Sequence, residues 1–311
     1  MSARQLLRLA LVFLALLVLW GAAALGRRRT SAPASGDTLR LPPIARGAVD
    51  TLVLARPGDT VVLARKDTSA WTANGFPAAA QAINDLLGAL ADGSTGSELV
   101  AERRASHAAL GVDSAGGTRV RVRSRGRTLA DLVVGHRSPD FSGGYARLAD
   151  QERTYLVRGR LVEELTRPSD EWRDHRIASV SADSIGAIEV SRGARRYELR
   201  RAASGWTLSP GGPADTSRAA ALVGAYRTVQ AGGFAAASQA DSARFTPPDR
   251  RVRVLRKDGS PLLTLLFDST AAGMWVRSDT GKTIYRMDAY EADQLAPADT
   301  SLRAKPAPAR R

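Results

Sequence analysis

The residues that decide the fold are VDTLVLARPGDTVVLARKDTSAW, residues 49–71, and IGAIEVSRGARRYELRRAASGW, residues 185–206. Each stretch contains an apolar run, a glycine-containing turn, a second run in which apolar and polar residues alternate, and a final tryptophan. Alternation with a period of two is typical of a strand that buries one face and exposes the other. Because Trp71 and Trp206 end the two stretches at an offset of 135 residues, the pattern predicts an internal duplication.

The correspondence continues beyond both tryptophans. Apolar residues at helical spacing follow each of them, at 79–90 and at 222–229, and predict one amphipathic helix per copy. Strand-like stretches at 118–135 and 250–268 match in turn, and Arg147 corresponds to Arg277 at an offset of 130 residues. Loop deletions in one copy produce an offset that shrinks in this way.

This order predicts an α+β fold, with an N-terminal transmembrane helix followed by two tandem similar units. Each unit is expected to contain a β-hairpin, one amphipathic helix and a mostly antiparallel meander. We expect the units at residues 48–167 and 185–295, with a connecting segment at 168–184. Residues 296–311 are rich in alanine, proline and arginine, and are expected to form a disordered tail.

An uncharged run precedes the duplicated part. Residues 9–26 contain no charged side chain, and arginines flank the run at positions 4, 8 and 27–29. A helix of this length extends about 27 Å, close to the ~30 Å hydrocarbon core of a bilayer. We therefore interpret residues 1–29 as a membrane anchor and residues 30–47 as a linker. The alternative is a cleaved signal peptide, because Ala22-Ala23-Ala24 offers a cleavage site.

The composition excludes several kinds of chemistry. The 311 residues include no cysteine and only three histidines, which excludes thiolate nucleophiles, disulfides and cysteine-ligated zinc. Of the net charge of +14, residues 1–46 contribute +6 and residues 296–311 contribute +3, so the body is only mildly basic. A nucleic-acid footprint is expected to cluster on a folded domain, and we therefore predict no nucleic-acid binding.

Three short motifs that resemble catalytic sites fit structural roles better. Gly281-Lys282-Thr283 lacks the first glycine of a phosphate-binding loop. His136, Asp140 and Ser142 fall in one short loop, whereas the members of a catalytic triad usually converge from separate elements. The acidic residues at 170–174 stand among arginines and indicate surface ion pairs. We therefore predict a non-enzymatic protein with no catalytic residues, no cofactor and no metal.

A set of aromatic, glycine and arginine residues marks both copies. In order along the chain they are Trp71, Pro77, Gly135, Tyr145-Ala146-Arg147, Tyr155-Leu156-Val157, Trp172-Arg173-Asp174, Trp206, Trp275 to Arg277 and Tyr285. This arrangement resembles the bacterial domain-of-unknown-function family 4340 (DUF4340) over residues 48–295. The second copy departs from the first at Gly135, where Phe267 or Asp268 stands in register. Family members are commonly encoded beside ABC-transporter-like proteins of the gliding-motility type, so the resemblance implies a membrane-tethered accessory subunit.

These observations lead to an expected function and location. We expect a non-enzymatic, membrane-anchored envelope protein that serves as an accessory or binding subunit of an ABC-type transport system. Its expected partners are the membrane, through residues 9–26, and an ABC-type permease or related subunit. The expected location is the inner (cytoplasmic) membrane, single-pass, with the body on the extracytoplasmic side, although the flanking charges are balanced and do not decide the side.

A second function is kept as an alternative. The chain would then be an extracytoplasmic receptor for a glycan or a small anionic ligand. In this hypothesis the cleft between the two units is lined by Arg147, Trp172 and Arg173, which are the candidate ligand or partner contacts. Trp172 is also interpreted as a buried packing residue, the commoner role of a tryptophan inside a fold.

Overall fold

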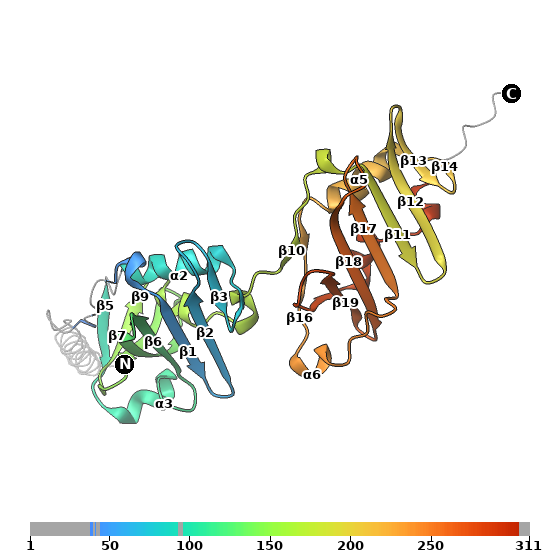
Figure 1. Ribbon diagram of the computed structural model, residues 1–311. Coiled ribbons are helices and arrows are strands. Elements are labelled where there is room, and N and C mark those ends of the chain that lie inside the picture. The colour runs from blue at the N-terminus through green and yellow to red at the C-terminus, as the bar shows by residue number, and fades with distance from the viewer. Residues whose placement is uncertain (1–37, 40, 42–43, 93–95, 305–311) are drawn as a thin grey trace, which may run out of the picture. The chain divides into compact units, whose positions relative to one another are not determined.

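The computed structural model describes residues 38–39, 41, 44–92 and 96–304, and divides into two compact units (Figure 1). Of the described residues, the first unit comprises those from 38 to 69 together with 81–167, and the second comprises 70–80 and 168–304. Strands make up 42% and helices 23% of the described residues. Each unit is therefore built on a sheet, to which a few helices are added.

The first sheet has nine strands. They are β1 (Thr51–Arg56), β2 (Asp59–Arg65), β3 (Trp71–Ala73), β4 (Phe76–Pro77), β5 (Ser97–Ala101), β6 (Thr118–Ser124), β7 (Arg127–Arg137), β8 (Gly143–Leu148) and β9 (Thr154–Arg158). Their spatial order is β4-β3-β2-β1-β6-β7-β8-β9-β5. Hairpin β3–β4 is hydrogen-bonded into this sheet. The residues that contain it, 70–80, are nevertheless grouped with the second compact unit.

Alternation of apolar and polar residues explains the central strands of this sheet. Leu52 and Leu54 of β1 and Val120 and Val122 of β6 are fully or almost fully buried, and the residues between them are more exposed. Strands β1 and β2 are joined by the two-residue turn Pro57-Gly58, in which Gly58 has a φ of 78°. Proline fixes the first turn position and glycine accepts the positive φ at the second, so the local sequence sets this hairpin.

Two longer helices of the first unit bury one face each. α2 (Ala80–Asp92) buries five apolar residues at helical spacing, and α4 (Leu161–Leu165) lies against β7 and β8. The remaining short elements of this part are η1 (Arg46–Ala48), η2 (Arg104–Ser106) and α3 (His107–Leu110).

The second sheet repeats the first. Its strands are β11 (Ala187–Arg192), β12 (Arg195–Ala202), β13 (Gly205–Ser209), β14 (Gly212–Pro213), β16 (Gly233–Phe234), β17 (Arg250–Leu255), β18 (Pro261–Thr270), β19 (Gly273–Ser278) and β20 (Tyr285–Met287). Their order is β14-β13-β12-β11-β17-β18-β19-β20-β16, which is the order of the first sheet strand for strand. The internal duplication inferred from the sequence is therefore present as two sheets of one topology.

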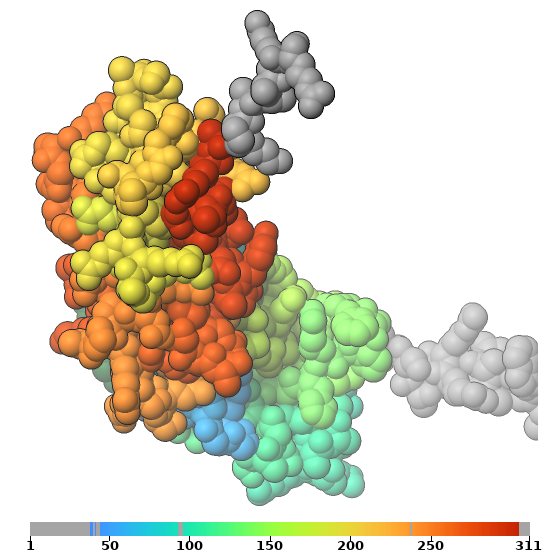
Figure 2. Space-filling view, turned by 90° about the vertical axis from the view of Figure 1, so that its right-hand side faces the viewer, coloured from blue at the N-terminus to red at the C-terminus, as the bar shows by residue number. Residues whose placement is uncertain are grey.

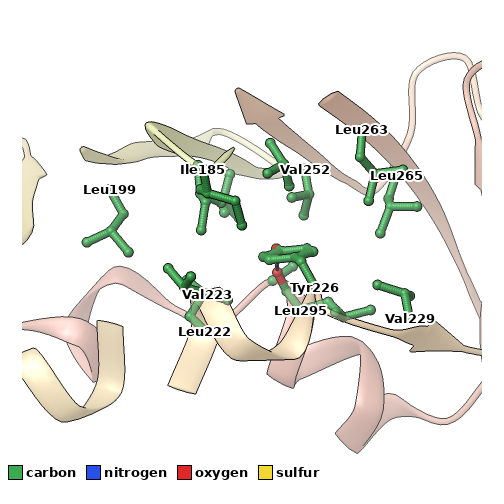
Figure 3. Packing of buried hydrophobic residues seen from close by; sticks show 14 of the residues in the cluster. Ile185, Leu199, Leu222, Val223, Tyr226, Val229, Val252, Leu263, Leu265 and Leu295 are labelled. Carbon is green, nitrogen blue, oxygen red and sulfur yellow. Dashed lines mark hydrogen bonds between the residues drawn. The ribbon is translucent and has the colours of Figure 1, made fainter. Parts of the chain in front are cut away.

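Two capped helices cover one face of the second sheet. α5 (Thr216–Ala225) and α7 (Ala289–Leu295) begin after Asp215 and Asp288, and each aspartate accepts a hydrogen bond from a backbone N–H in the first turn. Figure 3 shows Leu222, Val223 and Tyr226 from the α5 region and Leu295 from α7 facing side chains of the sheet, among them Leu199, Val252 and Leu265. This layer of apolar side chains is the core of the second unit.

Equivalent hydrogen bonds, from one arginine side chain and from one backbone N–H in each copy, connect corresponding segments of the two copies. Arg65 donates to the carbonyl oxygens of Val49 and Arg46, both at 2.9 Å, and Arg201 donates in the same way to Ile185 at 3.2 Å and Ala182 at 3.1 Å. The N–H of Ala79 donates to Trp172 O at 2.9 Å, and that of Asp215 donates to Leu302 O at 2.8 Å. The short helical segments that end in Trp172 and Leu302 thus play the same role beside hairpins β3–β4 and β13–β14.

The remaining elements are short helices and the two strands of a separate small sheet. They are η3 (Ser169–Trp172), β10 (Arg176–Ala178), η4 (Ala182–Ser184), β15 (Val229–Gln230), α6 (Ala237–Ala240) and α8 (Asp299–Leu302). β10 pairs with β15 in a two-stranded sheet. α8, in red, lies at the surface of the second unit beside the yellow β13–β14 segment (Figure 2). Residues 299–302, expected in a disordered tail, are therefore helical.

The predicted fold class needs two corrections. The described residues are mostly antiparallel β-sheet, and the part of each unit expected as a hairpin and a meander forms a single nine-stranded sheet, in which stretches expected as turns pair as short strands at the edges. Val229, expected in a helix, begins β15. The predicted transmembrane helix is not part of this fold: no helix within the described ranges is long and apolar enough to span a bilayer, and residues 9–26 lie outside them.

Candidate functional site

Arg147 on β8 is the first of the candidate contact residues. Its neighbour Ala146 is buried in the core of the first unit, so Arg147 points to the opposite face of the sheet. Its Nε donates to Val112 O at 2.9 Å, and its Nη1 donates to the carbonyl oxygens of Leu148, Ala149 and Gln151, each at 3.1 Å. Four carbonyl oxygens therefore hold the guanidinium in one orientation.

Arg147 lies in a cavity of about 650 Å³ on this face of the first unit. The volume is within the usual range of small-molecule sites, about 300 to 1,000 Å³. The wall residues are Ala55, Arg56, Pro57, Arg104, His107, Asp113, Ser114, Gly117, Arg119, Val133, Arg147, Ala149, Asp150, Gln151 and Glu152. We call this space the Arg147 cavity.

One wall of the Arg147 cavity is the segment 104–117, and glycines let it lie close to the sheet. A Cβ atom on Gly135 of β7 would be 2.3 Å from the carbonyl oxygen of Leu110, and one on Gly117 would be 2.6 Å from Val133 Cγ1. His107 is 4% exposed, and its Nε2 lies 2.7 Å from Glu152 O, on the loop after β8. Close backbone packing and this hydrogen bond thus fix both sides of the opening.

The two charged side chains that act on the pKa of Arg147 are both positive. Burial lowers the pKa of Arg147, and the charges of Arg104 and Arg119 lower it further. Arg119 is itself neutralised by Asp131, to which it donates from Nε at 2.9 Å and from Nη2 at 2.8 Å. The same pair lowers the pKa of Asp131. In the described part of the chain, no carboxylate pairs with Arg147 or Arg104.

Trp172 and Arg173, the other two candidate residues, belong to the second compact unit, whereas Arg147 belongs to the first. Trp172 is completely buried, in agreement with a packing role. The guanidinium carbon of Arg173 lies 4.0 Å from the ring centroid of Phe76 and 3.6 Å from that of Phe234. Burial lowers the pKa of Arg173. Its charge is stabilised by two aromatic rings, which makes it a packing residue as well.

The counterpart of Arg147 in the second unit is Arg277. Arg147 pairs across the strands with Val133, and Arg277 pairs in the same way with Leu266. The guanidinium of Arg277 lies 4.7 Å from the ring centroid of Phe245, and Phe245, Leu266 and Trp275 form a separate apolar cluster. In the second unit, aromatic side chains thus fill the space that corresponds to the open cavity around Arg147.

The loop between β7 and β8 has a feature that the sequence analysis did not single out, the exposed side chain of Phe141. This loop is three residues longer than the β18–β19 connection, as the paired residues Val134–Ala146 and Phe267–Val276 show. Phe141 at its tip is 73% exposed and has a φ of 57°, an unusual conformation for a bulky residue. The only sequence signal was the change in repeat offset.

Hydrogen bonds hold the Phe141 loop. Phe141 N donates to Ser138 O at 2.9 Å, and Gly143 N donates to Ser138 Oγ at 3.2 Å. Hydrogen bonds from the side chain of Ser138 and from Ser142 lower the pKa of the Asp140 carboxyl to about 2. The triad considered for this loop is therefore a turn motif, in which Asp140 accepts from the backbone and hydroxyl of Ser142.

The fold defines a class: a tandem duplication of one nine-stranded, mostly antiparallel sheet with helices on its core side. The described residues contain no cluster of three or more potential metal ligands. The chain belongs to the family described as Domain of unknown function (DUF4340), whose model matches residues 71–243. That range includes Arg147, Trp172 and Arg173. The chain matches no curated protein and no solved structure.

Proposed function

We propose that the chain is a non-enzymatic accessory or binding subunit associated with an ABC-type transport system of the cell envelope. The observation that carries the proposal is Phe141, a phenylalanine that is 73% exposed at the tip of a hydrogen-bonded loop. An exposed aromatic ring on a preformed loop is a typical anchor of a protein interface, because it buries apolar area with little loss of conformational entropy. Arg137, 5.6 Å from the ring centroid, supplies an adjacent polar contact.

The test is co-purification of the full chain from mild detergent with an ABC-type permease. We expect Phe141→Ala to lower recovery of the permease at least about tenfold, as loss of an interface anchor does. Tyr290→Ala is the matched control, because Tyr290 is also 73% exposed but lies on α7 of the second unit. Failure to recover a permease with the unmodified chain, or equal recovery with Phe141→Ala, contradicts the proposal.

The location is part of the same proposal. We propose association with the inner membrane through residues 9–26, with the body on the extracytoplasmic side; the uncharged run and its flanking arginines support it. Deletion of residues 1–29 should move the protein to the soluble fraction, and a reporter fused after Arg311 should be active outside the cytoplasm. A truncated chain that stays with the membrane in cells lacking the transporter contradicts this attachment.

A receptor for a glycan or a small anionic ligand is the second candidate function. The Arg147 cavity favours it, because a guanidinium without a carboxylate partner lies in a space large enough for a small molecule. The two candidates differ in what they predict: a receptor is stabilised by a ligand added alone, whereas an accessory subunit requires a protein partner.

A further inference from the structure

We propose that the Arg147 cavity of the first unit binds the carboxylate or phosphate group of a small anionic molecule. The inference rests on the receptor function, the second candidate above, and is independent of the proposed contact between Phe141 and a transporter.

The guanidinium of Arg147 is preorganised for hydrogen bonding to a ligand. Its Nε and Nη1 are occupied by four carbonyl oxygens, whereas its Nη2 makes no hydrogen bond within the described residues. The side-chain entropy that a long arginine normally loses on binding is thus already lost in the fold. The two N–H donors of Nη2 remain for a ligand oxygen, with which they can form charge-assisted hydrogen bonds.

The local charge favours an anion over a neutral ligand. Arg104 is exposed, and neither Arg104 nor Arg56, whose Nη2 donates to Arg167 O, pairs with a carboxylate in the described part of the chain, so three guanidiniums of the cavity wall have no ion-pair partner. Asp131 neutralises Arg119. An anion between Arg104 and Arg147 relieves the repulsion between them, which a neutral ligand does not do.

Three acidic residues of the wall do not cancel this charge. The carboxylate of Asp113 accepts a hydrogen bond from Gly116 N at 2.8 Å and is used in the turn. Asp150 and Glu152 are exposed. None of the three contributes to the pKa of Arg147, on which only Arg104 and Arg119 act among the charged groups. The acidic residues therefore form no ion pair with Arg147 within the described residues.

The second unit supplies an internal comparison. Arg277 has the place of Arg147, yet its guanidinium lies over Phe245, and Leu266 and Trp275 pack beside it. The same strand position is thus a packing site in one copy and a cavity with an available donor in the other. An anion is therefore expected in the first unit alone.

The experiment uses the full chain in detergent, with inorganic phosphate and citrate as probes and chloride at equal ionic strength as reference, because salt screens unspecific attraction. Binding of either probe, measured by titration calorimetry and by a rise in Tm, is expected. Binding of phosphate alone or of citrate alone identifies the group recognised. If neither probe binds at about 10 mM, the proposal is overturned. The dissociation constant would then exceed about 10 mM, which corresponds to a binding free energy weaker than about −3 kcal/mol.

The variant that locates the site is Arg104→Gln. We expect it to weaken binding about ten- to a hundredfold, the effect of losing a hydrogen bond to a charged group. Arg103→Gln, which removes the same charge from a neighbouring residue outside the cavity wall, should bind like the unmodified chain. Equal loss in both variants, or no loss in Arg104→Gln, overturns the proposal. Neither result bears on recovery of the permease, so failure of the two proposals can be told apart.

Discussion

Arg147 and Arg277 occupy the same position in two copies of one sheet and meet different surroundings. Carbonyl oxygens and an open cavity surround Arg147, whereas Arg277 lies over Phe245 within an apolar cluster. The strand order and the arginine are shared, and the difference comes from the segments that cover them. The comparison teaches that duplication preserved the sheet while the covering loops diverged, which is where binding residues usually arise.

Gly135 and Asp268, at equivalent positions of the two sheets, hold the covering segments of the two units in different ways. Gly135 in the first unit allows the backbone of Leu110 to approach closely. The corresponding residue of the second unit is Asp268, whose carboxylate accepts a hydrogen bond from Arg244 N at 2.8 Å. One copy holds its covering segment by close packing, and the other holds it by a side-chain hydrogen bond.

The largest expected effect is that of Gly135→Val. A Cβ atom at this position would lie 2.3 Å from Leu110 O, so the segment 104–117 must move. We expect a loss of about 3 kcal/mol or more in the stability of the first unit. Asp268→Ala removes only one hydrogen bond and should cost the second unit about 1 kcal/mol. Hydrogen exchange resolved by peptides measures each unit separately, and equal losses contradict this account.

Glu164→Gln tests a buried ion pair of the first unit. The Glu164 side chain is 1% exposed and lies 2.6 Å from Arg160 and 2.5 Å from Arg167. Removing its charge takes away the buried anion of both ion pairs, and we expect a loss of about 3 kcal/mol. Glu163→Gln is the control, because Glu163 is 52% exposed and its pair with Arg137 should contribute less than about 1 kcal/mol. Denaturant unfolding with similar losses for both would argue against burial as the cause.

Lysine substitutions compare the two equivalent arginines directly. Lysine keeps the charge but cannot reproduce the planar set of donors of arginine. Arg147→Lys should therefore cost about 1 to 2 kcal/mol through lost bonds to carbonyl oxygens. Arg277→Lys, which loses mainly a stacking contact with Phe245, should cost about 0.5 to 1 kcal/mol. The reverse order in unfolding experiments would show that carbonyl bonding is not the main role of Arg147.

The smallest expected effect is the acid dependence of the Phe141 loop. The Asp140 carboxyl has a folded pKa of about 2 against 3.8 for the free group. Because the folded pKa is the lower one, the stabilisation it gives the Phe141 loop is present above pH 3.8 and is lost as the pH falls through about 2. A carboxyl titration followed by NMR should show this midpoint, and Ser142→Ala should raise it toward 3.8. A midpoint near 3.8 in the unmodified chain would mean that the turn is not formed.

Much of the sheet could be predicted because its signal is periodic. Alternation in residues 49–71 and 185–206 marks strands, and the matching tryptophans mark the duplication. β4, β14 and β16 could not be predicted, since a two-residue strand has no period and is defined only by its partner. The helix at 299–302 was missed for a similar reason: a single turn within a proline- and alanine-rich stretch resembles a tail.

The candidate site could be predicted only in part. The correspondence of Arg147 with Arg277 follows from the repeat, but the sequence does not show that one is open and the other covered. That difference depends on the path of the segment 104–117 and on Phe245, which lie far from Arg147 and Arg277 in sequence. The sequence hypothesis places Trp172 and Arg173 with Arg147 at a cleft expected between the two units. Their burial and ring contacts depend on three-dimensional neighbours that the sequence does not name.

The central claim is that the arginine site of the first unit is open, whereas the equivalent site of the second unit is filled by aromatic side chains. The most direct test is hydrogen exchange of the full chain with and without saturating phosphate or citrate. The account predicts that the anion protects residues 104–119 and 147–152 and leaves residues 245–251 and 275–278 unchanged. Equal protection of both sets, or protection of the second set alone, would contradict it.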